Sequence, residues 1–85
     1  MNYTIVIEKK AGKEAEKIPI KYRVAIDKAI FSLSSNPRPY GSKKLTGKGG
    51  YRIRVGNYRV LYTIDDTGKT VVIYRIKIKG TTTYK

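Results

Sequence analysis

The sequence predicts an α+β fold. An N-terminal strand and a three-stranded antiparallel meander form one sheet. The α-helical hairpin between them in the chain covers one face of that sheet. Apolar and polar residues alternate over residues 3–8, and apolar residues follow helical spacing over residues 11–34. Three strand-like segments separated by short turns follow from residue 51. A chain of 85 residues has room for one modest core, so we expect a single domain over residues 1–85.

The first half of the chain provides the leading strand and the helices. Residues 3–8 alternate as a half-buried strand, and residues 11–17 are good helix formers. Pro19 cannot continue a helix, so it separates this segment from a second helix over residues 20–34. The residues expected on the inner faces are Tyr3, Ile5, Ile7, Ala11, Ala15, Ile18, Tyr22, Ile26, Ala29, Ile30 and Leu33.

The second half provides a loop and the meander. Residues 34–50 are rich in Pro, Gly and Lys, which is typical of a loop. The strands expected after it cover residues 51–55, 58–64 and 70–77, with turns at Gly56-Asn57 and at residues 65–68.

The charge balance predicts an anionic partner. Lys and Arg number 19 against 6 Asp and Glu, a formal net charge of +13. Nucleic acid is the first candidate, followed by an anionic membrane surface and by an acidic protein. The sequence has no Cys and no His, so we expect neither disulfides nor a metal site. The N-terminus reads as a strand, and no apolar run approaches the roughly 20 residues of a membrane span, so a cytoplasmic protein is expected.

Arginines gather on one face of the expected hairpin. A two-residue turn at Gly56-Asn57 places Arg54 opposite Arg59 and Arg52 opposite Leu61. Because side chains alternate along a strand, the three arginines share one face and the apolar residues share the other. Two readings remain open: ordinary solvated charges, or a phosphate site that relieves the repulsion between facing cations. The absence of Asp and Glu between residues 27 and 65, and the choice of Arg over Lys, favour the phosphate site.

Further cations flank this hairpin. Residues 42–50 contain Gly and Lys but lack the spacing of a P-loop and precede a strand, so a flexible basic loop is the preferred reading. Its Lys43, Lys44 and Lys48, with Arg75 of the last expected strand, are candidates for contacts to an RNA backbone.

Three segments resemble the RelE/ParE toxin superfamily of type II toxin–antitoxin systems. They are Asn36-Pro37-Arg38-Pro39, Lys43-Lys44-Leu45-Thr46-Gly47 and the block YRIRVGNYRVLY at residues 51–62. The resemblance covers nearly the whole chain and implies the compact fold of that family. It also implies a RelE-like activity, which is cleavage of mRNA in the ribosomal A site on the basic face of the sheet.

The resemblance also implies roles for individual residues. Arg52, Arg54 and Arg59 match the family's basic residues on two adjacent strands, and Tyr84 matches its tyrosine near the end of the chain. A second catalytic arginine of the family is either missing from this chain or replaced by Lys79. Tyr84 is the first candidate for the general base, and Lys77 or Lys79 is the second. The implied partners are a cognate RelB-like antitoxin, the ribosome and mRNA.

The chemistry needs no metal and no other cofactor, because RNA brings its own nucleophile. Attack of the 2′-OH on phosphorus requires in-line geometry and stabilisation of charge, which arginines supply. We therefore expect a metal-independent endoribonuclease that leaves a 2′,3′-cyclic phosphate and a 5′-OH. Two alternatives have the same fold: a ParE-like inhibitor of DNA gyrase, and a catalytically inert module that binds RNA or the ribosome.

Overall fold

The predicted α+β class is confirmed by a computed structural model, which describes residues 2–45, 47 and 49–78. The elements in chain order are β1 (Thr4–Ile7), α1 (Lys9–Glu16), α2 (Ile20–Ser32), β2 (Lys43–Lys44), β3 (Tyr51–Val55), β4 (Tyr58–Asp65) and β5 (Thr70–Ile78).

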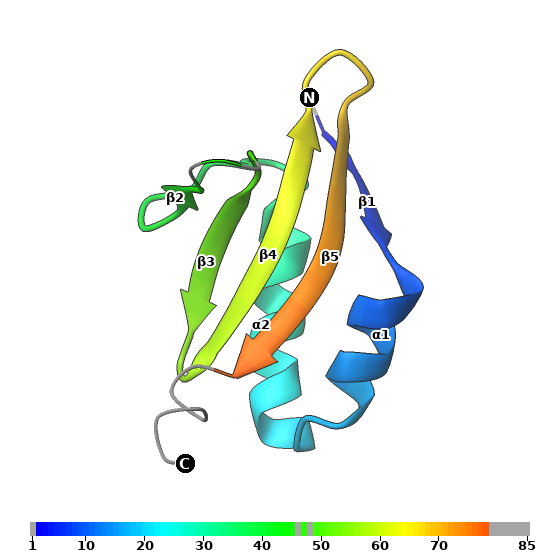
Figure 1. The fold of residues 1–85 in the computed structure, drawn as a ribbon, viewed down its shortest axis with the longest axis vertical. Coiled ribbons are helices and arrows are strands. Elements are labelled where there is room, and N and C mark those ends of the chain that lie inside the picture. Colours follow the sequence, from blue (N-terminus) through cyan, green and yellow to red (C-terminus); the bar gives the residue numbers. More distant parts are fainter. Residues whose placement is uncertain (1, 46, 48, 79–85) are drawn as a thin grey trace.

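The strands form one mixed sheet in the order β1-β5-β4-β3-β2 (Figure 1). The predicted meander is present as antiparallel pairs of β3 with β4 and of β4 with β5. The first strand runs parallel to the last, with Thr4 beside Thr70 and Ile7 beside Ile73. A parallel pair needs a long crossover connection, and everything between β1 and β5 provides it.

Several boundaries differ from the prediction. The first helix begins at Lys9 rather than Ala11, because the strand ends at Ile7 and Glu8 stands at the helix N-cap. The second helix ends at Ser32, because the amides of Leu33 and Ser34 bond to carbonyls three residues back at 3.0 and 3.1 Å, which tightens the last turn.

The expected loop over residues 34–50 contains a strand that was not predicted. Lys43 and Lys44 pair with Arg52 and Tyr51 and so add the short β2 to the outer edge of the sheet. Lys-Lys carries no intrinsic strand preference, so tertiary pairing decides its conformation.

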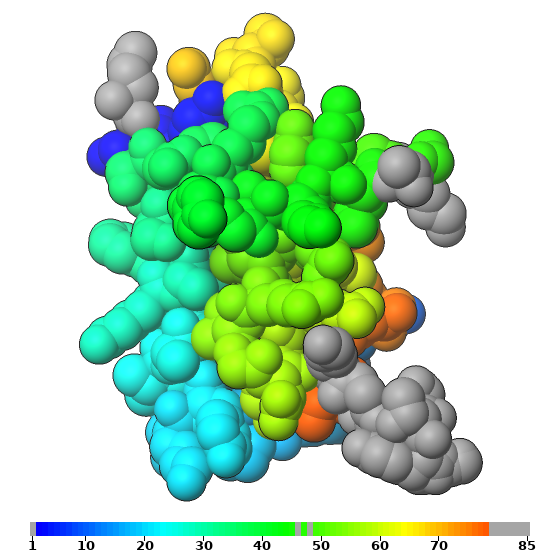
Figure 2. All heavy atoms as spheres, turned by 90° about the vertical axis from the view of Figure 1, so that its left-hand side faces the viewer, coloured from blue at the N-terminus to red at the C-terminus, as the bar shows by residue number. Residues whose placement is uncertain are grey.

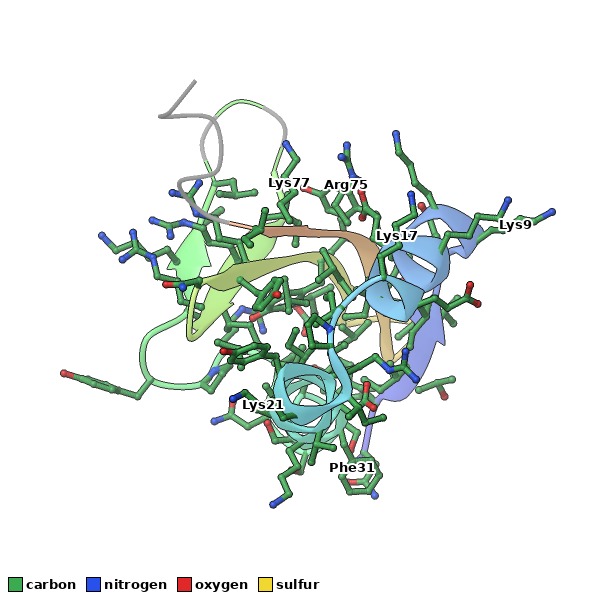
Figure 3. The ribbon with its side chains drawn as sticks, turned by 90° about the horizontal axis from the view of Figure 1, so that it is seen from below. Lys9, Lys17, Lys21, Phe31, Arg75 and Lys77 are labelled. Carbon is green, nitrogen blue, oxygen red and sulfur yellow. The ribbon has the colours of Figure 1, made fainter. Side chains whose placement is uncertain are left out.

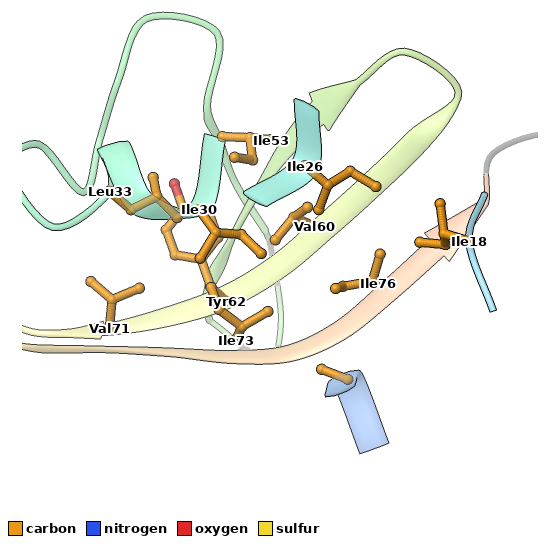
Figure 4. Close-up of a cluster of buried hydrophobic side chains, with 11 residues drawn as sticks. Ile18, Ile26, Ile30, Leu33, Ile53, Val60, Tyr62, Val71, Ile73 and Ile76 are labelled. Atoms are coloured by element: carbon orange, nitrogen blue, oxygen red, sulfur yellow. The ribbon is translucent and has the colours of Figure 1, made fainter. Parts of the chain in front are cut away.

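The core lies between the sheet and α2 (Figure 4). Ile26 and Ile30 of α2, with Leu33 directly after the helix, face Val60, Tyr62, Val71 and Ile73 of the central strands, and all of them are buried. Fully burying one such aliphatic side chain stabilises the fold by about 1.5–3 kcal/mol. Ile7 departs from its predicted inner position, since the edge strand β1 leaves it 48% exposed.

The two helices contribute differently. Figure 1 looks onto the face of the sheet that α2 does not cover, with α2 behind the strands. The first helix lies along the edge of β5 beyond the end of β1, with Ala11 buried in the core. Neither helix of the described residues has the length and apolar character that a membrane crossing requires.

The loop after α2 is fixed to the sheet by hydrogen bonds. The buried Tyr62 hydroxyl donates to the carbonyl oxygen of Pro37 at 2.8 Å. Arg38 forms an ion pair with Asp66 at 2.9 Å and donates to the Tyr51 hydroxyl at 3.1 Å. These contacts hold the segment that leads into β2, so they also position Lys43 at the edge of the sheet. In Figure 2 this loop lies above α2 on the β2 side of the molecule.

Candidate nucleic-acid interface

Five cations occupy neighbouring positions on the face of the sheet that α2 leaves uncovered, which we call the open face. The predicted hairpin register is confirmed: Arg54 pairs with Arg59, and Arg52 pairs with Leu61. On β5, Lys77 pairs with Arg59, so one row across three strands reads Arg54, Arg59, Lys77. We call the five residues the cationic grid; they are Lys43, Arg52, Arg54, Arg59 and Lys77.

Lys43 belongs to the grid because of the strand that was not predicted. Its pairing with Arg52 places both side chains on the same face, about 5 Å apart at their Cβ atoms. Lys44 pairs with Tyr51 and therefore lies on the opposite face. Of the two neighbouring lysines proposed as RNA contacts, only Lys43 is placed beside the arginines.

The grid is electrostatically unfavourable without an anion. Desolvation lowers the pKa of Arg52 from its ordinary value, and the neighbouring charges of Arg54 and Arg59 lower it further. The Nε of Arg59 is buried without a hydrogen-bond partner among the described residues. Within residues 2–45, 47 and 49–78, no carboxylate forms an ion pair with any member of the grid. The grid thus offers forked donors to phosphate oxygens, which would satisfy both its charge and its unpaired donor.

Arg75 has an intramolecular partner. Its Nε donates to the Glu14 carboxylate at 2.9 Å, and the other oxygen of Glu14 accepts the amide of Ile76 at 2.7 Å. The Glu14 carboxylate thus accepts a backbone N–H of β5 beyond the point where β1 stops pairing with this strand. Figure 3 shows Arg75 and Lys77 on the side of the sheet opposite α2, with Arg75 directed towards α1. Much of the charge of Arg75 is therefore neutralised within the protein, whereas Lys77 remains exposed.

Three predicted site residues lie outside the described residues. They are Lys48, Lys79 and Tyr84. Of the residues considered for the general base, Lys77 is the one that the structure describes, and it lies directly across from Arg59.

The chemical capacity of the described site follows from its composition. It holds guanidinium and ammonium groups on a rigid sheet, an arrangement suited to binding phosphates and to stabilising negative charge on phosphorus. The sequence has neither His nor Cys, and the described part of the chain contains no cluster of three carboxylates that would hold a metal ion.

Sequence reasoning missed the connection between β2 and the grid and the neutralisation of Arg75. Neither has a local signal, since Lys43 meets Arg52 across a loop and Glu14 lies 61 residues from Arg75. The alternation of Arg52 and Arg54 and the Gly56-Asn57 turn, in contrast, are local signals and were sufficient for the hairpin.

Comparisons with known proteins agree with this geometry. The family described as "ParE toxin of type II toxin-antitoxin system, parDE" matches residues 5–80. The toxin RelG of Mycobacterium tuberculosis is 35% identical over 80 residues, which cover 89% of this chain and 90% of that protein.

Two solved complexes have the same fold. One chain of the RelBE2 toxin–antitoxin complex from Mycobacterium tuberculosis is 33% identical, with a TM-score of 0.82 over 93% of this chain and 100% of that chain. The archaeal RelE–RelB complex from Pyrococcus horikoshii gives 28% identity and a TM-score of 0.85 over 95% and 99% of the two chains. The chain therefore belongs to the RelE/ParE superfamily and is a toxin of a type II toxin–antitoxin system.

Proposed function

We propose that this toxin is a ribosome-dependent endoribonuclease that inhibits translation by cutting mRNA in the A site. The observation that carries the proposal is the cationic grid, because it gathers forked phosphate donors on the face of the sheet opposite α2. The similarity to RelG and to archaeal RelE supports a target in translation. Action on ribosome-bound message also implies a cytoplasmic location and the ribosome and mRNA as partners.

In the proposed reaction the 2′-oxygen forms a bond to phosphorus while the bond from phosphorus to the 5′-oxygen breaks. The 2′-proton passes to a general base, and the departing 5′-oxygen takes up a proton. The products are a 2′,3′-cyclic phosphate and a 5′-OH, and the reaction uses no cofactor. The grid arginines stabilise the charge that builds up on the phosphoryl oxygens. We propose Tyr84 as the general base, with Lys77 or Lys79 as the second candidates, and a contribution of roughly 10²- to 10⁴-fold in rate.

Primer extension on translating ribosomes tests the proposal. Wild-type protein should produce cuts in A-site codons, and Arg59→Ala and Tyr84→Phe should reduce them. The new ends should resist 5′-phosphate-dependent degradation, because they carry a 5′-OH. Cuts bearing a 5′-phosphate would exclude attack by the 2′-OH.

The alternative target is DNA gyrase, and it is favoured by one observation: the matching family is described as a ParE toxin. A gyrase supercoiling assay with the same protein separates the two candidates. Inhibition of supercoiling without ribosomal cuts would replace the first proposal, and failure of both assays would leave a module that binds RNA or the ribosome.

We further propose that a RelB-like antitoxin binds this toxin partly through the outer side of α2. Ile20, Val24 and Phe31 recur at helical spacing on one side of the helix and are 68%, 49% and 75% exposed. Figure 3 shows Phe31 pointing away from the sheet. An apolar stripe on a protein of net charge +13 fits an acidic amphipathic segment. Co-expression of the adjacent gene product should restore growth, and absence of rescue and of binding would contradict this partner.

A further inference from the structure

A cavity of about 320 Å³ lies on the open face next to the cationic grid. Its lining residues come from four separate places in the chain; they are Glu8, Gly49, Thr63, Val72 and Tyr74. Thr63 pairs with Val72 across β4 and β5. Leu61 pairs with Arg52 of the grid, and Thr63 follows Leu61 by two residues, about 7 Å along β4. The cavity is therefore the next position along the same face.

A β-bulge directs Tyr74 into this cavity. Leu61 pairs with Arg75 and Tyr62 with Ile73, so Tyr74 is an extra residue on β5. Its hydroxyl lies 3.5 Å from the point that a Cβ on Gly50 would occupy, which means that the side chain reaches across β4 towards β3. Gly50 has φ +89° and leaves room for it. The bulge thus places an aromatic side chain on the same face as the cationic grid.

Glu8 contributes the acidic group of the cavity. It is the N-cap of α1, yet its side chain makes no capping hydrogen bond. In the part of the chain that the structure describes, its carboxylate has neither a hydrogen bond nor an ion pair, in contrast to Glu14 and Asp66. A carboxylate beside an anion-binding surface repels phosphate, but it accepts hydrogen bonds from neutral N–H donors.

We propose that this cavity binds one unpaired nucleobase of the RNA whose phosphates contact the grid. The Tyr74 ring lies against the base, and the Glu8 carboxylate accepts an N–H donor from the base edge. Adenine, cytosine and guanine present an exocyclic amino group, whereas the uracil N3–H lies between two carbonyl oxygens that repel a carboxylate. The site therefore favours bases that carry an amino group over uracil. This inference rests on RNA binding by the grid, which belongs to the proposed function, but not on RNA cleavage.

Fluorescence anisotropy with short oligo(A), oligo(C) and oligo(U) strands tests the proposal. Wild-type protein should bind oligo(A) and oligo(C) more tightly than oligo(U) by about 5-fold or more. Glu8→Gln should remove this preference, because the Gln amide also donates to uracil oxygens. Glu16→Gln is the matched control, since it makes the same charge change on an exposed position of α1 and should retain the preference.

Tyr74 variants test the aromatic contact separately. Tyr74→Leu should weaken binding of all three strands by roughly 5- to 150-fold, the range expected for loss of one base–aromatic contact. Tyr74→Phe keeps the ring and should bind nearly as wild type does, which also checks that the bulge folds. Equal wild-type binding of the three strands, or equal effects of Glu8→Gln and Glu16→Gln, would overturn the base site. The ribosome assay reads cleavage rather than binding, so absence of cuts with the base preference intact would overturn the proposed cleavage alone, and cuts without the preference would overturn the base site alone.

Discussion

Removing Arg54 should make the free protein more stable and its binding to RNA weaker. Arg54 is exposed and lies directly opposite Arg59, and like charges at such positions destabilise a sheet. Arg54→Thr removes the repulsion and keeps a residue with strand preference. The expected gain is a few tenths to about 1 kcal/mol, which is about 1 to 8 °C in melting temperature for a domain of this size.

The same substitution should lower the salt dependence of RNA binding. The logarithm of the affinity for single strands falls with the logarithm of salt concentration by about 0.7 for each phosphate neutralised. Five grid cations therefore predict a slope of about −3.5, and loss of one predicts about −2.8. Anisotropy titrations from low to moderate salt measure this slope, and differential scanning fluorimetry measures the melting temperature.

Lys28→Gln is the matched control for this experiment. Lys28 is an exposed cation on α2, which covers the opposite face of the sheet, so its loss should leave the slope close to the wild-type value. A melting temperature of Arg54→Thr below that of wild type would contradict the repulsion between Arg54 and Arg59, and an equal change of slope in the two variants would contradict phosphate binding by the grid.

Three further predictions concern the core, the loop and the partner surface. Tyr62→Phe should lower the free energy of unfolding by about 1–3 kcal/mol in denaturant titrations, because the buried Pro37 carbonyl loses its donor; unchanged stability would contradict this. The Arg38 hydrogen bond, followed by that from Tyr3, lowers the pKa of Asp66 from 3.8 to about 2. The ionised Asp66 carboxylate therefore contributes its full stabilisation above pH 3.8, and this contribution is lost as the pH falls towards 2. Asp66→Asn lacks this carboxylate, so its melting temperature should change less than that of wild type between about pH 4 and pH 2. Phe31→Ser should weaken antitoxin binding in calorimetry by roughly 10-fold or more while RNA binding and melting temperature stay near wild type; an unchanged antitoxin affinity would exclude the α2 stripe.

Local patterns carried most of the fold prediction. The Gly56-Asn57 turn, with Gly56 at φ +60°, set the register of the hairpin and hence the shared face of Arg52, Arg54 and Arg59. Pro19 separates the two helices because its ring fixes φ and leaves no backbone N–H to donate, and no tertiary contact changes this. Such signals are contained within a few residues and so can be read directly.

Features that depend on contacts between distant residues could not be predicted from local sequence patterns. The pairing of Lys43 with Arg52 depends on where the loop after α2 is fixed, and Arg38 and Tyr62 fix it through contacts to Asp66 and Pro37. The bulge that presents Tyr74 arises from a mismatch of two strands that each look regular alone. Both features concern residues of the grid or of the cavity beside it, where local preference and tertiary structure are expected to disagree.

The distribution of acidic groups explains why the open face is left positively charged. Glu14 neutralises Arg75, and Asp66 neutralises Arg38, so these carboxylates serve the fold rather than the grid. The uncompensated charge lowers the stability of the free protein, and any anion that binds the grid restores it by mass action. RNA and an acidic antitoxin segment placed on the grid would therefore compete for the same cations. An antitoxin held on the α2 stripe alone would bind the other side of the sheet and leave the grid free. Neutralisation of the toxin by masking thus requires an antitoxin that reaches both surfaces, with apolar residues for α2 and acidic residues for the grid.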